Sequence, residues 1–481
     1  MSISSALSNA MTGLRAAGRA SEIISANIAN ASTPSYGVRS LGVSSSQIGG
    51  VFIDGINRNV NPGLLSDLRL SEAEFSNREA TNAFLTDLEN ILGTPDEPNS
   101  LSARMSEFEN SLIMATSRPD APERLLASID AARDLTTLIS SASDDIQEAR
   151  SNADRSIKIQ VDELNTALVN VKELNSQITR TVSRGGDASA LLDNRQAVVD
   201  EISKTVPVRQ VPRDNGQIAL YSTGGAILLD GGVSEIGFDA VNQVTPFLTI
   251  EGGGLSGLTV NGYPVRTDSE RGALGGGTLG AQFEIRDELG TSAQTQLDAL
   301  SRDLIERFQD PAVDPTLAPG DAGLFTDGGL AFDPLNETGL SGRLTVNPVV
   351  DDRQGGDPWR LRDGLNAAAP GDVGDSRLLQ RLSSALTDVR VPSSGEFGAG
   401  AFSAINLIST LTSQVAADRY RSEQSLAFSS SRFDELTQQM LAEGVDTDQE
   451  LQRLIFVEQS FAANVRLIEA ADEMMQTILR I

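Results

Sequence analysis

Both ends of the 481-residue chain carry apolar residues at alternating steps of four and three, and this repeat most constrains the fold. Near the N-terminus, the repeat predicts a helix with the seam Ile3, Leu7, Ala10, Leu14, Ala17, Ile24 and Ile28. Such a helix would be roughly 40 Å long, too long to bury its apolar stripe alone. We therefore expect it to lie along another helix.

The C-terminal segment offers that second helix. Residues 447–450 read Thr-Asp-Gln-Glu and predict a capping box that starts it. Its expected seam is Leu454, Val457, Phe461, Asn464, Ile468, Ala471, Met475 and Ile478. The two seams predict pairing within one molecule, between molecules, or both. The alternative is two core helices of an ordinary bundle, but most domains fray at their termini, where both seams lie.

Composition excludes several kinds of chemistry. The chain has neither cysteine nor histidine, which rules out a disulfide, a Ser-His-Asp triad, a Cys-His pair and an imidazole zinc site. A net charge of −28 makes nucleic acid and anionic membranes poor partners. No charge precedes Arg15 and no continuous apolar block follows, so we expect no cleavable secretory signal and export by another route.

The order of helical and strand-like patterns predicts a mainly α protein with an inserted β domain. Helical spacing runs from about Pro122 to Val182, which indicates an elongated rod of long antiparallel helices formed by both chain halves. We expect four parts: a coiled-coil-like inner domain, weakly ordered in the monomer, from 1–60 plus 445–481; a rod from 61–205 plus 278–444; a β domain at 206–277; and an irregular loop or reduced second insertion at 310–372.

Three smaller patterns complete the prediction. Asp54-Gly55 indicates a turn between two short strands, and Phe247-Leu-Thr-Ile250 indicates a strand. Two glycine-rich segments, 252–257 and 275–280, fit the dinucleotide pattern G-x-G-x-x-G. Neither has both the preceding strand and the following helix, so we interpret them as a β turn and a hinge. Paired acidic residues are expected on a solvated face, and no catalytic, cofactor or metal site is predicted.

Asparagines are more informative than these motifs. Asn464 falls on a seam position, where a buried amide would fix the register of two helices; the alternative is an amide on a wet face. Asn27-Ile-Ala-Asn30-Ala-Ser-Thr33-Pro34-Ser-Tyr36 ends the first helix, because Pro34 forces Thr33 out of helical geometry.

This stretch resembles the N-terminal signature of bacterial flagellar axial proteins, which include rod, hook and hook-associated proteins. Its family-signature residues are Asn27, Asn30, Thr33, Pro34 and Tyr36. Segments 50–58, 174–178, 191–195, 276–280 and 461–468 are similar to the hook–filament junction members of that family. The family's usual Thr-Pro-Gly-Tyr is Thr-Pro-Ser-Tyr here, and 310–372 is shorter than the family's second β insertion.

The resemblance implies a noncatalytic structural adaptor at the hook–filament junction of the bacterial flagellum, outside the cell. It implies export through the flagellar type III system with a chaperone bound near the C-terminus. The implied partners are copies of the same chain in a ring, the hook protein, and a second hook-associated protein leading to flagellin. No cofactor, nucleic acid or membrane partner is implied.

Other functions remain open at this point. A different axial component, such as a rod or hook subunit, shares the terminal signature, although the β insertion argues against it. An extracellular glycan hydrolase would need a pair of carboxylates in a cleft, which no pattern specifies. An adhesin would use the β domain.

Overall fold

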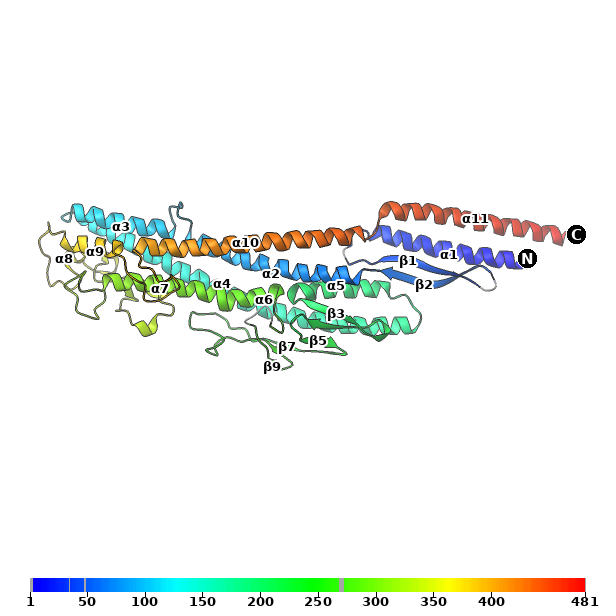
Figure 1. Cartoon of the computed structure of the whole chain (residues 1–481), viewed down its shortest axis with the longest axis horizontal. Helices are drawn as coiled ribbons and strands as arrows, with labels where there is room; N and C mark the ends of the chain where they lie inside the picture. Colours follow the sequence, from blue (N-terminus) through cyan, green and yellow to red (C-terminus); the bar gives the residue numbers. More distant parts are fainter. Residues whose placement is uncertain (1–2, 34, 47–48, 268–271, 481) are drawn as a thin grey trace.

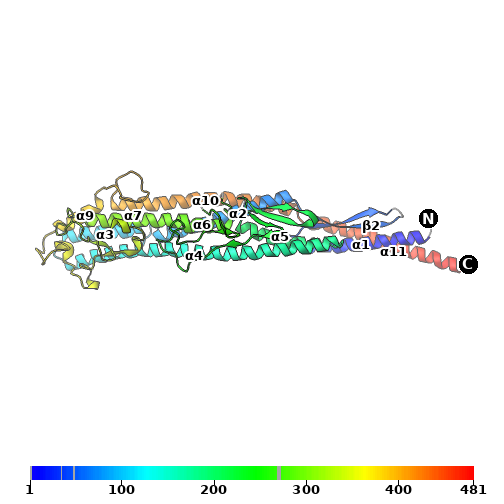
Figure 2. The same ribbon diagram turned by 90° about the horizontal axis from the view of Figure 1, so that it is seen from below.

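The computed structural model describes residues 3–33, 35–46, 49–267 and 272–480 of the chain. It is a long rod in which the chain leaves from one end, turns back at the other, and returns (Figure 1). The first and the last helix therefore lie side by side at the same end. Figure 2 shows the same arrangement from a perpendicular direction.

Helices make up most of the described residues, and the predicted mainly α fold with inserted β structure is confirmed. The helices are α1 (Ile3–Ala29), α2 (Pro62–Leu92), α3 (Leu101–Ser117), α4 (Pro122–Ser183), α5 (Ser189–Thr205), α6 (Gly277–Glu284), α7 (Gly290–Phe308), α8 (Arg360–Asp363), α9 (Arg377–Thr387), α10 (Ala404–Ala442) and α11 (Thr447–Leu479).

The strands form four small antiparallel sheets. Strands β1 (Val38–Ser45) and β2 (Val51–Asn59) form a hairpin beside α1. The inserted region holds a four-stranded sheet and a three-stranded sheet: β3 (Val208–Pro212), β4 (Ile218–Ser222), β5 (Ile227–Asp230) and β6 (Gly232–Val233), then β7 (Ile236–Gly237), β8 (Thr259–Val260) and β9 (Tyr263–Pro264). Strands β10 (Phe325–Asp327) and β11 (Leu344–Val346) pair in the distal region.

The backbone of the rod is α4, whose 62 residues span roughly 93 Å. Pro122 opens it at a position where a missing N–H costs nothing, and the chain leaves it before Gly185. Its apolar residues recur on one side and are buried along its whole length. Helices α2 and α10 pack together along the rod, where Phe75 and Phe433 stack with ring centroids 5.6 Å apart. The two chain halves thus share one rod.

Two hydrophobic cores fill the rod. The distal core contains three mutually packed rings, those of Phe108, Phe308 and Phe325, and includes apolar residues of the 310–372 region such as Leu340. The second core joins the later part of α4 to α5 and to the β3–β6 sheet. The 310–372 region is mostly irregular chain, but it contributes buried side chains to the distal core. Its standing as a separate insertion stays a prediction.

A buried ion pair fastens the β insertion to α4. Arg286 Nη1 donates to Asp154 Oδ1 over 2.6 Å, and both side chains are fully buried. The other Asp154 oxygen accepts from the backbone N–H of Val241, and Arg286 also donates to the carbonyl of Ser256. A one-turn π-helix at Ile285–Leu289 brings Arg286 to this position. The loops of the β insertion are therefore held by polar contacts as well as by apolar packing.

Three local predictions were wrong. Strand β2 runs straight through Asp54-Gly55, and Gly55 (φ +146°) forms a bulge opposite Gly42/Val43 in place of the expected turn. Residues 247–250, all described, form turns because the two sheets of the insertion already pair without them. The cap of α11 is Asp446, whose side chain accepts from the N–H groups of Asp448 and Gln449. An aspartate directly before the helix competes successfully with the predicted threonine cap.

Candidate assembly site at the paired termini

Helices α1 and α11 pack against each other as an antiparallel pair at the end of the rod (Figure 1). Of the predicted α1 seam, Ala10, Ala17 and Ile24 are buried, and the half-buried members are Ile3, Leu7, Leu14 and Ile28. Of the predicted α11 seam, Ala471 is buried, and the half-buried members are Leu454, Val457, Asn464 and Ile468. Three members remain exposed: Phe461, Met475 and Ile478. The structure thus brings the two seams together within one chain, while part of the second seam faces outward.

Asn464 sits where the two helices approach closely. A Cβ atom built on Gly13 would lie 2.9 Å from both terminal atoms of the Asn464 side chain. The Asn464 amide donates to the carbonyl of Ser460, one turn earlier in its own helix. The absence of a side chain at Gly13 therefore makes room for this amide. The interpretation that Asn464 fixes the register of the pair stays a prediction.

The other side of α1 is covered by the β1–β2 hairpin. Thr12 Oγ1 accepts from the backbone N–H of Val51, and a Cβ on Gly50 would lie 2.4 Å from the same oxygen. Helix α1 is thus enclosed between α11 and the hairpin. Helix α11 packs chiefly against α1, and its buried residues are only Glu450 and Ala471. Of the two terminal helices, α11 is the one with most of its surface uncovered.

Asn27 organises the chain where α1 ends. Its side chain is fully buried; its amide donates to the carbonyl of Arg39, and its oxygen accepts from Tyr36 Oη (2.8 Å) and the Arg39 N–H (3.1 Å). Burial raises the pKa of the Tyr36 hydroxyl, so it remains a donor at ordinary pH. The Arg39 guanidinium lies 4.8 Å from the centre of the Tyr36 ring. Asn27 therefore joins the end of α1 to the start of β1.

The other signature residues have smaller contacts. The Asn30 amide donates to the carbonyl of Ala26 in the last turn of α1, and the Asn30 carbonyl accepts from the N–H of Thr33. The Thr33 carbonyl in turn accepts from the N–H of Tyr36. Pro34 lies outside the described residues. The signature thus forms a tight turn whose centre is the buried side chain of Asn27.

A carboxylate on α5 fastens this terminal unit to the rod. Asp193 accepts from the N–H of Gly37 (3.0 Å), from Arg39 Nη2 and from Arg58 Nε (2.7 Å). Arg58 also donates to Gln196 Oε1 over 2.6 Å. The Arg58 side chain lies so close to Gly37 that a Cβ there would be 2.4 Å from Nε. Charge-assisted bonds of this kind fix orientation as well as adding energy.

Our sequence reasoning assigned no role to Arg39, Arg58, Asp193 or Gln196. Arg58 and Asp193 lie inside two of the segments that resemble the junction proteins, 50–58 and 191–195. A charged residue at matched positions in two separate family segments was the available signal for this contact. Their pairing across 135 positions of sequence could not be obtained from local periodicity.

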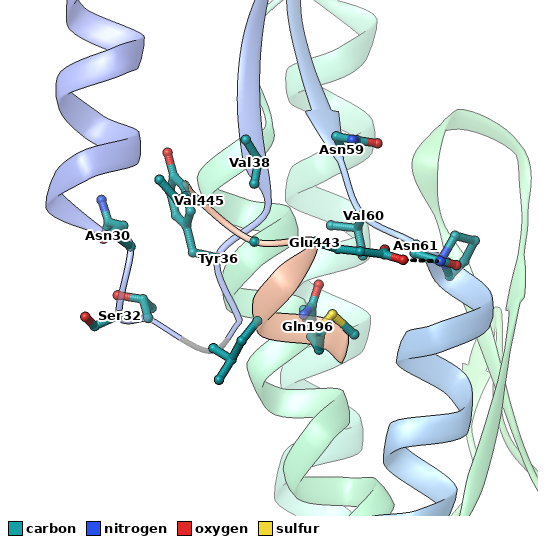
Figure 3. A pocket seen from close by; sticks show the side chains of 16 residues that line it. Asn30, Ser32, Tyr36, Val38, Asn59, Val60, Asn61, Gln196, Glu443 and Val445 are labelled. Carbon is teal, nitrogen blue, oxygen red and sulfur yellow. Dashed lines mark hydrogen bonds between the residues drawn. The ribbon is translucent and has the colours of Figure 1, made fainter. Parts of the chain in front are cut away.

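A cavity of about 640 Å³ lies at the same joint, between the turn after α1, the end of β2 and the link from α10 to α11. Figure 3 shows Tyr36, Val60 and Val445 around it, with Gln196 contributed by α5. The amide of Asn61 donates to Glu443 Oε1 across it, and Asn61 also caps α2. The terminal unit is thus joined to the rod on two sides of a hollow.

The exposed side of α11 carries a second apolar stripe. Its members are Phe456, Leu467, Met474 and Ile478, which follow one another at steps of 11, 7 and 4 and so lie along one face. Phe456 is 71% exposed and Ile478 60%. We call these four residues the outer stripe. Apolar residues aligned along an exposed helix face are typical of an interaction surface.

In the described ranges, no group of three or more acidic side chains is placed to hold a metal ion. Among the same residues, none of the helices combines the length and the apolar content needed to cross a bilayer.

Comparison with known proteins places this architecture. Residues 85–312 match the family described as flagellar hook-associated protein FlgK helical domain. Residues 7–36 match the flagella basal body rod protein family, and residues 437–481 match the C-terminal family of the flagellar basal body rod FlgEFG proteins.

Individual relatives agree with the family matches. Flagellar hook-associated protein 1 of Escherichia coli K12 is 24% identical over 363 residues, which are 73% of this chain and 64% of that protein. The protein of the same name from Salmonella typhimurium is 27% identical over 240 residues, 48% of this chain and 43% of that protein. The chain therefore covers less than two thirds of either relative.

Among solved structures, the flagellar hook junction protein FlgK from Burkholderia pseudomallei overlaps with a TM-score of 0.46 and 18% identity, over 55% of this chain and 47% of that one. The resemblance indicated by the sequence is confirmed by the family matches and the curated relatives: the chain belongs with the flagellar hook-associated protein 1 family, and its two ends are of the flagellar rod type.

Proposed function

We propose that this chain is a structural adaptor of the bacterial flagellum, which polymerises at the distal end of the hook and joins the hook to the filament. The observation that carries the proposal is the pair α1–α11, which is placed at one end of a rigid rod and leaves the outer stripe of α11 uncovered. An enzyme active site has no use for such an end. A subunit that must close around its own copies does.

The proposed assembly begins with export. We propose that the chain leaves the cell through the flagellar type III system, guided by a chaperone that binds near the C-terminus. The absence of cysteine suits passage in an extended form, since no disulfide can form on the way. The uncovered surface of α11 would give a chaperone an apolar helix face to bind before assembly.

The proposed partners are copies of the same chain in a ring, the hook protein on one side, and a second hook-associated protein leading to flagellin on the other. The terminal segments that match rod-type families support contacts with other axial subunits. The match of residues 85–312 to the FlgK helical domain favours the junction over another rod or hook position.

Complementation tests the proposal. The organism that encodes this chain should lose swimming when the gene is deleted and should carry hooks without filaments in electron micrographs. The full chain should restore both, and so should Ile159→Ala, which alters an exposed residue of α4 far from the termini. A chain lacking residues 1–30 should restore neither, with its export measured separately in the medium.

Two results would overturn the proposal. One is a deletion strain that still builds filaments on its hooks. The other is restoration of filaments by the exported chain that lacks residues 1–30. The second result would favour an adhesin or a hydrolase, because neither activity depends on the terminal pair.

A further inference from the structure

The terminal unit has three layers with apolar groups exposed on its two outer layers. Helix α11 forms one outer layer, α1 the middle, and the β1–β2 hairpin the other outer layer, as both Figure 1 and Figure 2 show. The outer stripe lies on α11. The hairpin exposes Val43 (52%), Phe52 (61%) and Ile53 (36%).

These two surfaces differ in charge as well as in position. Residues 1–60, which form α1 and the hairpin, contain four arginines and two acidic residues. Residues 447–481, which form α11, contain three arginines and six acidic residues. In a chain with a net charge of −28, the N-terminal layers are therefore a positive exception, and α11 is negative.

We infer that α11 of one copy docks through its outer stripe onto the β1–β2 hairpin of the next copy, in a head-to-tail contact. This inference rests on the proposed self-assembly and adds its direction. A two-fold contact between α11 helices would bring like charges together and leave the hairpin uncovered. The head-to-tail contact covers both apolar surfaces at once, joins opposite charges, and repeats from copy to copy.

The repeat has a structural consequence. A head-to-tail contact has two different surfaces, so each added copy presents the same pair of surfaces again. Such contacts close into a ring or continue as a helix, and neither can arise from a single two-fold contact. The direction of docking is therefore the property that makes a ring possible for this terminal unit.

Single-cysteine cross-linking tests the direction, because the natural chain has no cysteine. Leu467→Cys places a thiol on the outer stripe and Val43→Cys places one on the hairpin; both sites are exposed, so neither change should disturb folding. The purified variants are mixed at a concentration where sedimentation shows self-association, and a short bis-maleimide is added. The mixture should give severalfold more covalent dimer than either variant alone.

The remaining variants set the register and the background. Phe456→Cys, Met474→Cys and Ile478→Cys, each mixed with Val43→Cys, locate the hairpin along the stripe. Ile159→Cys on α4 measures chance collisions. Efficient dimer formation by Leu467→Cys alone, or no pair above the Ile159→Cys background, would overturn the inference. Loss of the cross-link in a chain that restores filaments would contradict only the docking direction, whereas a cross-link in a chain that does not restore them would contradict only the adaptor function.

Discussion

The side-chain amide of Asn464 lies against the Cα of Gly13, at a distance that leaves no room for a Cβ atom. Gly13→Ala should therefore separate α1 from α11 at this level and cost about 2 kcal/mol of local stability, because overpacked contacts force side chains from their rotamers. Amide exchange of α11 in the intact chain measures the loss.

Gly18→Ala is the matched control, since nothing lies within 4 Å of the Cβ it would add. It should stabilise α1 by about 0.5 kcal/mol through helix propensity. Asn464→Ala combined with Gly13→Ala should recover most of the lost protection, because the clash needs both side chains. Equal effects of the two glycine substitutions would show that Asn464 does not shape this contact.

Asn27→Ala should loosen the turn between α1 and β1. It removes three hydrogen bonds and leaves buried groups of Arg39 and Tyr36 without partners, at a cost of about 3 kcal/mol. Asn30→Ala, which loses one bond to its own helix, should cost less than about 1 kcal/mol. Limited proteolysis of residues 30–40 compares the two variants, and similar cleavage rates would contradict the central role of Asn27.

Asp193→Asn should free the terminal unit from the rod without unfolding either. Two arginines with mostly buried side chains would lose their counter-charge, and we expect a local cost of about 3 kcal/mol. Increased amide exchange at 37–59 with unchanged exchange in α4 is the expected signature. Asp162→Asn, which breaks an exposed ion pair with Lys158, should change exchange by less than about 0.5 kcal/mol.

Stability should rise on mild acidification. Burial raises the pKa of Asp200, Asp298 and Asp303 above the ordinary value of 3.8, so the folded chain takes up protons at a higher pH than the unfolded chain does. Free energy of unfolding therefore increases as pH falls from 7 toward these raised values. The negative net charge acts in the same direction, because protonation relieves repulsion.

The gain should reverse in stronger acid. Burial alone would raise the pKa of Glu306, but hydrogen bonds from Arg302 and Ser393 hold it below its ordinary 4.5. The stability that this group adds is present above its ordinary pKa and is lost as pH falls through its lowered value. Thermal melts from pH 7 down to about 3 should show a maximum in mild acid. A steady decline from pH 7 would contradict the raised pKa values of the buried aspartates, and Asp200→Asn should reduce the rise.

Periodicity predicted the elements that are long and buried on one face. The α4 stripe and the two terminal seams follow from apolar spacing alone, because a long helix shows its buried face in every turn. The same reasoning did not distinguish Asp446 from Thr447 as the cap of α11, since both residues precede the helix and both are good caps. It also misplaced the hairpin turn at Asp54-Gly55, where a bulge uses the same residue types.

The anchoring contacts could not be predicted from local patterns. Asp193 meets Arg58 only because the rod folds α5 back beside β2, and nothing in the spacing around either residue specifies the other. The same holds for Gly13 and Asn464, at opposite ends of the sequence. The seam pattern predicted that their helices would pair, but it left open whether the partner is the same chain or another. The structure pairs them within one chain and leaves the outer stripe uncovered.

Amide hydrogen exchange of the monomer and of the assembled protein, followed in α11, tests the central claim most directly. That claim is that the terminal pair is completed only by other copies. In the monomer, α11 should exchange far faster than α4, because it is covered on one side only. In the assembled state, the amides of 456–478 should become protected. Protection of α11 in the monomer equal to that of α4, with no change on assembly, would contradict the account.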